Sequence, residues 1–364
     1  MTATRSSDRL PDGREIYYYG EAPILADPSD GPSAGHWTPD RSELRWDPLM
    51  EEWVIVAPHR RRRAAATGAL CPLCPTRGDD LTEIPAARYD VAVFENRFPA
   101  LSGPWTADFA PVGPLPRSAA AAGRCEVISY SSEHDVTPAL LPAARLVTVI
   151  EALADRTAEL GAMPGVQYVF CFENHGAEVG ATVSHAHGQV YAYPFVPPRI
   201  ARMRDAARHS AARGAGCLFC EVQRQEAAGS RVVERGDHWT AFVPYAARWP
   251  YEIHLYPRRH LPDLAALTPA ERAELAQLYG SVLRRLAGLP GGPLPYMALW
   301  IQAPVTEDRE VFHLHLQIFT DRAGTGGPKR LAAGELGAGV FVSEVDPERA
   351  AEELRAVRTS AGLE

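Results

Sequence analysis

Two short patterns of cysteine and histidine occur in the same order in each half of this 364-residue chain. The order is C-x-x-C, then a single histidine, then H-x-H-x-Q. Zinc takes thiolate and imidazole ligands in a tetrahedron, and two cysteines two residues apart can hold one ion from a turn. Each half therefore predicts one structural Cys₂His₂ zinc site. The eight candidate ligands are Cys71, Cys74, His134 and His185 in the first half and Cys217, Cys220, His260 and His313 in the second.

The spacing indicates that the two patterns come from an internal duplication. The single histidine stands 51 residues before H-x-H in the first half and 53 in the second. The interval from the cysteine pair to that histidine is 60 residues against 40, and a Pro-, Gly- and Ala-rich stretch at 101–123 would absorb the difference. A Glu and a Tyr also precede the single histidine by eight and four residues in both halves, which predicts that Glu126 corresponds to Glu252 and Tyr130 to Tyr256.

The first H-x-H-x-Q segment has the residues for phosphoryl chemistry. If His185 faces a metal, His187 lies two residues on in the same strand and shares its face, as does Gln189. The preceding segment at 172–184, F-E-N-H-G-A-E-V-G-A-T-V-S, contains glycines that let backbone N–H groups approach an anion. A neutral imidazole is a competent nucleophile, and a glutamine amide can donate to a phosphoryl oxygen. We therefore predict that His187 and Gln189 are catalytic.

The second H-x-H-x-Q segment lacks a comparable loop. Residues 305–310, V-T-E-D-R-E, precede it and are acidic, which suits phosphate poorly. We therefore predict that His315, the counterpart of His187, is not catalytic.

The pattern of apolar residues predicts an α+β fold of two modules, each a mainly antiparallel sheet with packed helices. Residues 146–160 have the apolar period of a helix, and a second helix begins at Thr268 with the capping pattern T-P-A-E. The expected strands cover 53–56, 91–94, 126–130, 166–172 and 187–193 in the first half, and 240–243, 252–256, 296–302 and 311–320 in the second.

Composition narrows the class of protein. A net charge of -8 argues against a general nucleic-acid binder, although the basic run at 60–63 could meet phosphate. No apolar stretch reaches the roughly 18 residues of a membrane span, and the N-terminal residues show no signal-peptide core. We therefore expect a cytoplasmic protein whose cysteines are thiols or metal ligands. Cys125 and Cys171 stand singly in β-rich runs and are expected in the core.

Several longer motifs together carry a family resemblance. They are C-P-L-C at 71–74, F-E-N-H-G-A-E-V-G at 172–180 and H-A-H-G-Q-V-Y-A-Y-P-F at 185–195, with further similar stretches at 47–60, 93–101 and 238–252. With these motifs the chain resembles the galactose-1-phosphate uridylyltransferases, a duplicated family of the histidine-triad superfamily, over nearly its whole length. This implies two histidine-triad-like modules, a catalytic one at 1–195 and a degenerate copy at 196–364.

The resemblance implies a ping-pong transfer of UMP. His187 would attack the α-phosphorus of UDP-glucose and release glucose 1-phosphate, and galactose 1-phosphate would then take the UMP group. Gln189 would contact the transferred phosphate. The other implied contacts are Arg60 and Arg63 at phosphates, Leu73, Asn96 and Val127 beside uridine, Asn174, Gly180 and Thr182 in the phosphate loop, and Lys329 and Glu335 at the hexose, which in this family reach it from the partner subunit of a homodimer.

The chain departs from the family pattern at several positions. Ala186 replaces the proline of the usual H-P-H. Met203 and Ile301 stand where many members have the Glu and His of an iron-type site, so that site is expected to be absent and the second Cys₂His₂ set to take its place. A two-zinc arrangement resembles the related nucleotidyl phosphorylases, and no aromatic residue follows Lys329 as is usual in the family.

Two other functions therefore stay open at the level of sequence. One is an NDP-sugar phosphorylase or adenylyltransferase of the same fold, and the other is a zinc-stabilised nucleotide-binding protein without catalysis. The residues leave open the hexose acceptor, the base preference, the metal in each site and the oligomeric state.

Overall fold

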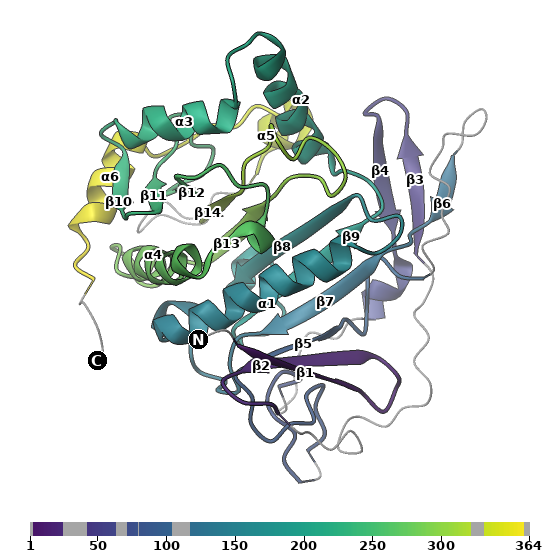
Figure 1. Cartoon of the computed structure of the whole chain (residues 1–364). Helices are drawn as coiled ribbons and strands as arrows, with labels where there is room; N and C mark the ends of the chain where they lie inside the picture. Colours follow the sequence, from purple (N-terminus) through teal and green to yellow (C-terminus); the bar gives the residue numbers. More distant parts are fainter. Residues whose placement is uncertain are drawn as a thin grey trace.

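One antiparallel sheet of eleven strands runs through both halves of the chain (Figure 1). The computed structural model describes residues 3–24, 42–62, 71–78, 80–103, 117–321 and 331–359. The strand order is β1-β2-β5-β7-β9-β8-β13-β14-β12-β11-β10. The first half supplies β1 (Thr4–Arg9), β2 (Glu15–Gly20), β5 (Val91–Glu95), β7 (Arg124–Ser129), β8 (Tyr168–His175) and β9 (His187–Tyr193). The second half supplies β10 (Val232–Arg235), β11 (Trp239–Phe242), β12 (Ile253–Pro257), β13 (Tyr296–Ile301) and β14 (His315–Phe319).

The two halves meet edge to edge where β8 pairs with β13. His175 lies opposite Tyr296 at one end of this seam, and Cys171 lies opposite Trp300 at the other. Counting outward from the seam, the first half reads β8-β9-β7-β5-β2 and the second reads β13-β14-β12-β11-β10. The order is the same in both directions, so β9 corresponds to β14 and β7 to β12. The duplication predicted from the motifs is therefore confirmed as a repeated sheet.

Two long helices cover one face of the sheet. They are α1 (Ala143–Gly161) and α4 (Pro269–Ala287), which lie side by side (Figure 1) and bury their apolar residues in one core that spans both halves. The N-terminus of α4 has the predicted capping box: the Glu271 N–H donates to Thr268 Oγ1 at 3.3 Å, and the Thr268 N–H donates to Glu271 Oε2 at 2.8 Å. Such a cap contributes about 1 kcal/mol to helix stability.

The opposite face of the second half is covered by two further helices. These are α2 (Pro198–Ala212) and α3 (Leu218–Ala227), which pack with Phe242 and Phe312 in a separate cluster. A three-stranded sheet lies away from α1 and α4 in Figure 1, and the C-terminal part adds two short helices. Their bounds are β3 (Glu43–Asp47), β4 (Glu52–Val56) and β6 (Ser118–Ala120), then α5 (Ala333–Ala338) and α6 (Pro347–Ala356).

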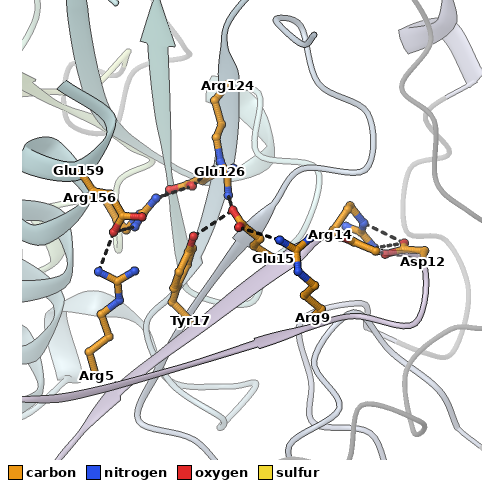
Figure 2. Close-up of polar contacts among 11 residues, drawn as sticks. Arg5, Arg9, Asp12, Arg14, Glu15, Tyr17, Arg124, Glu126, Arg156 and Glu159 are labelled. Atoms are coloured by element: carbon orange, nitrogen blue, oxygen red, sulfur yellow. Dashed lines mark hydrogen bonds and ion pairs between the residues drawn. The ribbon is translucent and has the colours of Figure 1, made fainter. Parts of the chain in front are cut away.

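A buried ionic network fixes β7 between α1 and the N-terminal hairpin (Figure 2). Arg156 of α1 pairs with Glu126 of β7 at 2.8 Å, and both side chains are fully buried. Arg124 bridges Glu126 to Glu15 of β2, with both distances at 2.7 Å. The Arg156 guanidinium also lies over the Tyr17 ring, 4.3 Å from its centroid. Removing one partner of such a buried pair costs about 3–5 kcal/mol, so this face of β7 is held rigidly.

The structure confirms most of the helices and strands predicted from the sequence and adds others that were not predicted. Every expected strand is present, the one at 187–193 with the expected ends and the others with one or both ends shifted, and both expected helices are confirmed. The hairpin of β1 and β2 was not predicted, because its exposed edge strand carries few apolar residues. Within the expected insertion at 101–123, residues 118–120 form β6, while residues 104–116 lie outside the described part of the chain.

The predicted match of Glu126 with Glu252 and of Tyr130 with Tyr256 is wrong by one residue. Val127 lies opposite Gln189 on β9, whereas His254 lies opposite Gln317 on β14. Measured from these matched glutamines, His254 corresponds to Val127, and the loop that follows the strand is one residue shorter in the second half. Since side chains alternate along a strand, the two glutamates face opposite sides of the sheet.

Among the described residues, no helix combines the length and the apolar composition that a bilayer span requires.

Candidate active site and metal centres

The first Cys/His set comes together as predicted. The ligand atoms of Cys71, Cys74, His134 and His185 all lie within 4.8 Å of one another. The sulfur of Cys74 is 3.4 Å from His134 Nδ1 and 3.7 Å from His185 Nδ1. The expected strand at 187–193 is confirmed as β9, but His185 stands just before it and does not share the strand with His187 as was expected.

The proton positions in this set suit a metal ion. His185 Nε2 lies 2.6 Å from the carbonyl of Ser131, which can only accept, so Nε2 carries the proton and the Nδ1 lone pair faces the sulfurs. Burial and the neighbouring Cys71 raise the pKa of Cys74 to about 11. Two thiolates therefore coexist here at neutral pH only if a cation lies between them. The four residues fit a tetrahedral ion of zinc type.

The second set repeats this arrangement. The ligand atoms of Cys217, Cys220, His260 and His313 also lie within 4.8 Å of one another. Cys220 Sγ is 3.3 Å from His260 Nδ1 and 3.5 Å from His313 Nδ1. His313 Nε2 donates to the Arg259 carbonyl at 3.1 Å, and burial lowers the pKa of His313 to about 4, which keeps its ring neutral as a ligand must be. This set could hold a second ion.

His187 presents one defined nitrogen for chemistry. Its Nδ1 lies 2.7 Å from the His185 carbonyl oxygen. Because a carbonyl only accepts, Nδ1 carries the proton and Nε2 carries the lone pair. Directly after His187, a Cβ on Gly188 would lie 2.5 Å from the Tyr130 hydroxyl and 3.0 Å from the Phe172 carbonyl oxygen, so only glycine fits. Strand β9 is therefore tightly packed against its neighbours at Gly188.

Gln189 is held with its amide in one orientation. The Tyr191 hydroxyl donates to Gln189 Oε1 at 3.2 Å, which leaves the amide N–H group to donate toward a ligand. Arg60, in a 3₁₀ turn at Pro58–Arg62, lies 3.4 Å from the same hydroxyl. Arg60, Tyr191 and Gln189 therefore form one chain of contacts, which joins the predicted phosphate residue Arg60 to the predicted catalytic residue Gln189.

The three residues expected beside uridine lie in or next to one apolar cluster. Leu73 and Asn96 are buried, and Val127 packs against the cluster that contains Leu73. Asn96 follows β5, and its Oδ1 accepts the N–H of Phe98 at 2.9 Å. Val127 stands opposite Gln189 in the β7–β9 register. An apolar wall therefore lies beside the polar chain that ends at Gln189.

The phosphate loop forms a turn with a cavity beside it. Gly176 and Gly180 flank a 3₁₀ turn at Ala177–Val179 with φ of 104° and 89°, values that favour glycine. A cavity of roughly 300–1,000 Å³ is typical of a small-ligand site, and the one here measures about 530 Å³ and is lined by Thr182 and by the candidate metal ligand His134. Asn174, expected in this loop, lies in β8 opposite Met297, and strand alternation places it on the same face as Phe172.

The remaining predicted contacts lie elsewhere. Arg63 and Lys329 are outside the described part of the chain. Glu335 lies in the first turn of α5, where its carboxylate accepts the N–H of Ala332 at 3.2 Å. The structure of this single chain thus brings the residues around His187 together but does not test the contacts expected from a partner subunit.

The sequence did not predict one buried cluster of polar side chains. Glu173 is fully buried, accepts the Tyr279 hydroxyl at 2.8 Å and also accepts the Tyr296 hydroxyl. Burial raises the pKa of Glu173 to about 6, although the tyrosine hydrogen bonds lower it. Tyr130 also hydrogen-bonds to Glu173 and lies against Gly188, so the cluster connects the second half to β9. Its members stand far apart in apolar runs, so no local sequence signal marks them.

The second H-x-H-x-Q segment differs in its hydrogen bonds. The Gln317 amide donates to His315 Nε2 at 2.9 Å, and its Oε1 accepts from Arg199 at 2.5 Å. His315 Nδ1 donates to the His313 carbonyl at 3.0 Å, as in the first copy. The nitrogen that corresponds to His187 Nε2 therefore accepts a hydrogen bond from Gln317, which supports the prediction that His315 is not catalytic.

Comparisons with known proteins agree over the whole chain. Residues 36–197 match the family model of the galactose-1-phosphate uridyl transferase N-terminal domain, and residues 203–358 match that of the C-terminal domain. A galactose-1-phosphate uridylyltransferase of Streptomyces lividans is 40% identical over 97% of this chain and 98% of its own. A solved uridylyltransferase is similar with a TM-score of 0.77 and 31% identity, over 86% of this chain and 98% of its own. An ADP-glucose phosphorylase of Arabidopsis thaliana, solved with ADP-glucose, has a TM-score of 0.68 and 25% identity, over 87% of this chain and 99% of its own.

Proposed function

Since the chain belongs to the galactose-1-phosphate uridylyltransferase family, we propose that it transfers UMP from UDP-glucose to galactose 1-phosphate through His187. The observation that supports the proposal is the hydrogen bond from His187 Nδ1 to the His185 carbonyl, which fixes the tautomer in which Nε2 carries the lone pair. The enzyme is thus a nucleotidyltransferase of sugar metabolism.

The reaction has two displacements at one phosphorus atom. Nε2 of His187 attacks the α-phosphorus of UDP-glucose, the bond to the bridging oxygen breaks, and glucose 1-phosphate leaves. The Nδ1–H bond to the carbonyl stabilises the positive charge that the ring acquires. A phosphate oxygen of galactose 1-phosphate then attacks the same phosphorus, the P–N bond breaks, and neutral His187 is restored.

The other predicted residues position the two substrates. Gln189 donates to the transferred phosphoryl group, and Arg60 supports it through Tyr191. The remaining proposed contacts are Leu73, Asn96 and Val127 at the uridine, Asn174, Gly180, Thr182 and Arg63 at the phosphates, and Lys329 and Glu335 of a homodimer partner at the hexose.

We propose zinc as the ion in both Cys/His sets, because two thiols and two neutral imidazoles match its ligand preference. A bound zinc ion would supply a structural cross-link, since four protein ligands leave no position for substrate. The sets join the C-x-x-C turn, the segment after β7 or β12, and the start of β9 or β14. They would hold a catalytic module at 1–195 and a supporting module at 196–364 in a cytoplasmic enzyme.

Intact-mass spectrometry after mixing with UDP-glucose tests the function. We expect a mass gain equal to UMP that maps to His187, and its loss on adding galactose 1-phosphate with formation of UDP-galactose. The variant His187→Asn serves as the control and should show no adduct while its metal content stays unchanged. A protein that binds UDP-glucose without any adduct would be the non-catalytic alternative.

The phosphorylase alternative is tested with the same adduct. Inorganic phosphate in place of galactose 1-phosphate, and ADP-glucose in place of UDP-glucose, should give less than about a tenth of the turnover. The higher sequence identity to the Streptomyces lividans galactose-1-phosphate uridylyltransferase, 40% against 27% for the Arabidopsis thaliana ADP-glucose phosphorylase, favours uridylyl transfer.

A further inference from the structure

A second ligand-sized cavity lies in the supporting half, beside the occupied histidine His315. It measures about 610 Å³ and is bounded by α2, α3 and the strands β12 and β14. Pockets of 300–1,000 Å³ are the usual size for small-molecule sites. The residues that matter for its chemistry are Arg199, Phe219, Arg248, His254, His315 and Gln317.

The cavity occupies the place in the second copy that the His187 site occupies in the first. His254 stands opposite Gln317 in the sheet as Val127 stands opposite Gln189. Phe219 occupies the same position of its C-x-x-C turn as Leu73 does in the first copy. The duplication has therefore kept the shape of a ligand pocket, with an apolar wall on one side and a glutamine on the other.

The charged groups around this cavity leave a cationic excess. Three arginines and two glutamates line it, Arg199, Arg231 and Arg248 against Glu226 and Glu252, which gives a formal charge of +1 with neutral histidines. Glu226 accepts the Tyr245 N–H and pairs with Arg231 at 2.6 Å.

The carboxylate of Glu252 also takes part in hydrogen bonds within the protein. Glu252 accepts the N–H groups of Arg248 and Trp249 and bonds His254 Nε2 at 2.9 Å. In both glutamates, each carboxylate oxygen therefore already has a hydrogen-bond partner other than Arg199.

Arg199 is the group that lacks a counter-ion. Over the described ranges, no carboxylate lies within ion-pair distance of its guanidinium, and its buried Nε has no hydrogen-bond partner. Its one hydrogen bond among those ranges runs to the neutral Gln317. Burial and the nearby Arg248 lower the pKa of Arg199 by more than Glu252 raises it. A buried guanidinium with an unsatisfied N–H is a strong recognition group for a phosphate.

The cavity lining also contains two aromatic rings. Phe219 is nearly buried, and Tyr245 is 76% exposed with Arg231 lying 5.1 Å from its ring centroid. A cavity that combines aromatic rings with a phosphate-binding cation suits an organic phosphate that carries a flat heterocycle. His315 cannot attack such a ligand, because Gln317 already donates to its Nε2.

We propose that the supporting half binds a nucleoside phosphate reversibly in this cavity, with its phosphate on Arg199 and Gln317 and its base against Phe219 and Tyr245. The chain then has two nucleotide sites, one that forms a covalent adduct and one that only binds. The second site does not depend on the function proposed for His187, because its recognition groups all belong to residues 199–317.

The test is the number of UMP molecules bound per chain, measured by equilibrium dialysis with labelled UMP on the full-length protein. Val127→Trp fills the first pocket and His254→Trp fills the second, so these two variants form a matched pair. Arg199→Met removes the charge at nearly constant length. We expect two UMP per chain for the natural protein, one for Val127→Trp and one for Arg199→Met, whose second-site binding falls at least about 30-fold.

The outcomes separate the two sites. If UMP binding is lost in Arg199→Met but unchanged in Val127→Trp, the second site exists and the nucleotide site proposed around His187 is wrong. If Arg199→Met and His254→Trp both bind as many UMP as the natural protein, the inference is overturned.

Two further measurements test the inference. Inorganic phosphate that binds Val127→Trp as tightly as UMP does would show a simple anion site and overturn the nucleoside part. If Arg199→Met fails to fold, hydrogen exchange on Val127→Trp decides the question: UMP should protect residues 198–227, and an absence of protection there overturns the inference.

Discussion

The two H-x-H-x-Q segments of this chain have similar backbones and differ in the groups that hold their glutamine side chains. In both, the second histidine donates from Nδ1 to the carbonyl of the first. In the first copy the Gln189 oxygen is held by the Tyr191 hydroxyl, whereas in the second the Gln317 amide donates to His315 Nε2. Phe319 stands two residues after Gln317, where Tyr191 follows Gln189, and it has no hydroxyl to hold the amide.

The comparison teaches that the motif does not by itself make a nucleophile. A single tyrosine, two residues past the glutamine, orients the amide away from the histidine in the first copy. In the second, Arg199 takes the glutamine oxygen and turns its amide onto the ring. We therefore expect catalytic competence to depend on the side chain that orients the glutamine, and single substitutions of that side chain can test this.

The largest effect should come from His187→Asn. Loss of the nucleophilic nitrogen removes the covalent intermediate, so we expect UMP transfer to fall at least about 10⁴-fold. Steady-state turnover with UDP-glucose and galactose 1-phosphate measures it. The circular dichroism and metal content should match those of the natural protein, and turnover within tenfold of normal would show that another residue carries the UMP group.

Loss of a metal ligand should come next. Cys74→Ser and Cys220→Ser each remove one of four ligands, and a structural zinc site contributes about 10–16 kcal/mol of apparent binding energy to a folded domain. We expect each variant to lose one equivalent of zinc by plasma mass spectrometry and to unfold at a clearly lower temperature. Cys74→Ser should also lose turnover, because its site ends at the residue next to the nucleophile strand. Equal losses of turnover in both variants would contradict unequal roles of the two halves.

The C-x-x-C pairs, the H-x-H pairs and the cap at Thr268 could be predicted from the sequence, because each depends on residue types at a short, fixed spacing. The eight candidate metal ligands come together as these patterns indicate. The pairing of Glu126 with Arg156 and the glutamine orientations depend instead on contacts between distant segments. The one-residue offset between Glu126 and Glu252 shows the same limit, since a match of residue types does not fix the register of a strand.

Tyr191→Phe gives the first copy the side chain of the second. Without the hydroxyl, Gln189 is free to turn its amide toward His187, so we expect turnover to fall roughly 5–10-fold, in line with one hydrogen bond of about 1 kcal/mol. The KM for UDP-glucose should change less than kcat if the glutamine acts on the transferred group. Phe319→Tyr is the matched control and should leave turnover unchanged, and an equal loss in both variants would refute the role of the hydroxyl.

The buried carboxyl of Glu173, in the strand that joins the two halves, should make the free energy of unfolding depend on pH. Its pKa in the folded protein is raised from 4.5 to about 6, so the folded state binds the proton more tightly than the unfolded one. The stabilisation is complete below pH 4.5 and is lost as the pH rises through 6, a change of about 2 kcal/mol. Glu173→Gln should flatten the unfolding free energy between these two pH values in urea titrations. Tyr279→Phe, which keeps the carboxyl, should retain a pH dependence, and an unchanged slope in Glu173→Gln would contradict the assignment.

The smallest effect on turnover should come from His315→Asn, the counterpart of the first variant. His315 is 1% exposed, and its ring stacks on Tyr256 with centroids 4.5 Å apart, so the change leaves a gap and an unpaired amide at Gln317. We expect a loss of about 1–3 kcal/mol in stability and less than a twofold change in turnover. Calorimetry and steady-state assays on both variants give the comparison directly: His187→Asn should keep its stability and lose its activity, and His315→Asn should do the reverse. A fall in turnover at His315→Asn as large as that at His187→Asn would mean that both copies take part in the transfer, and that the hydrogen bond from Gln317 opens when substrate binds.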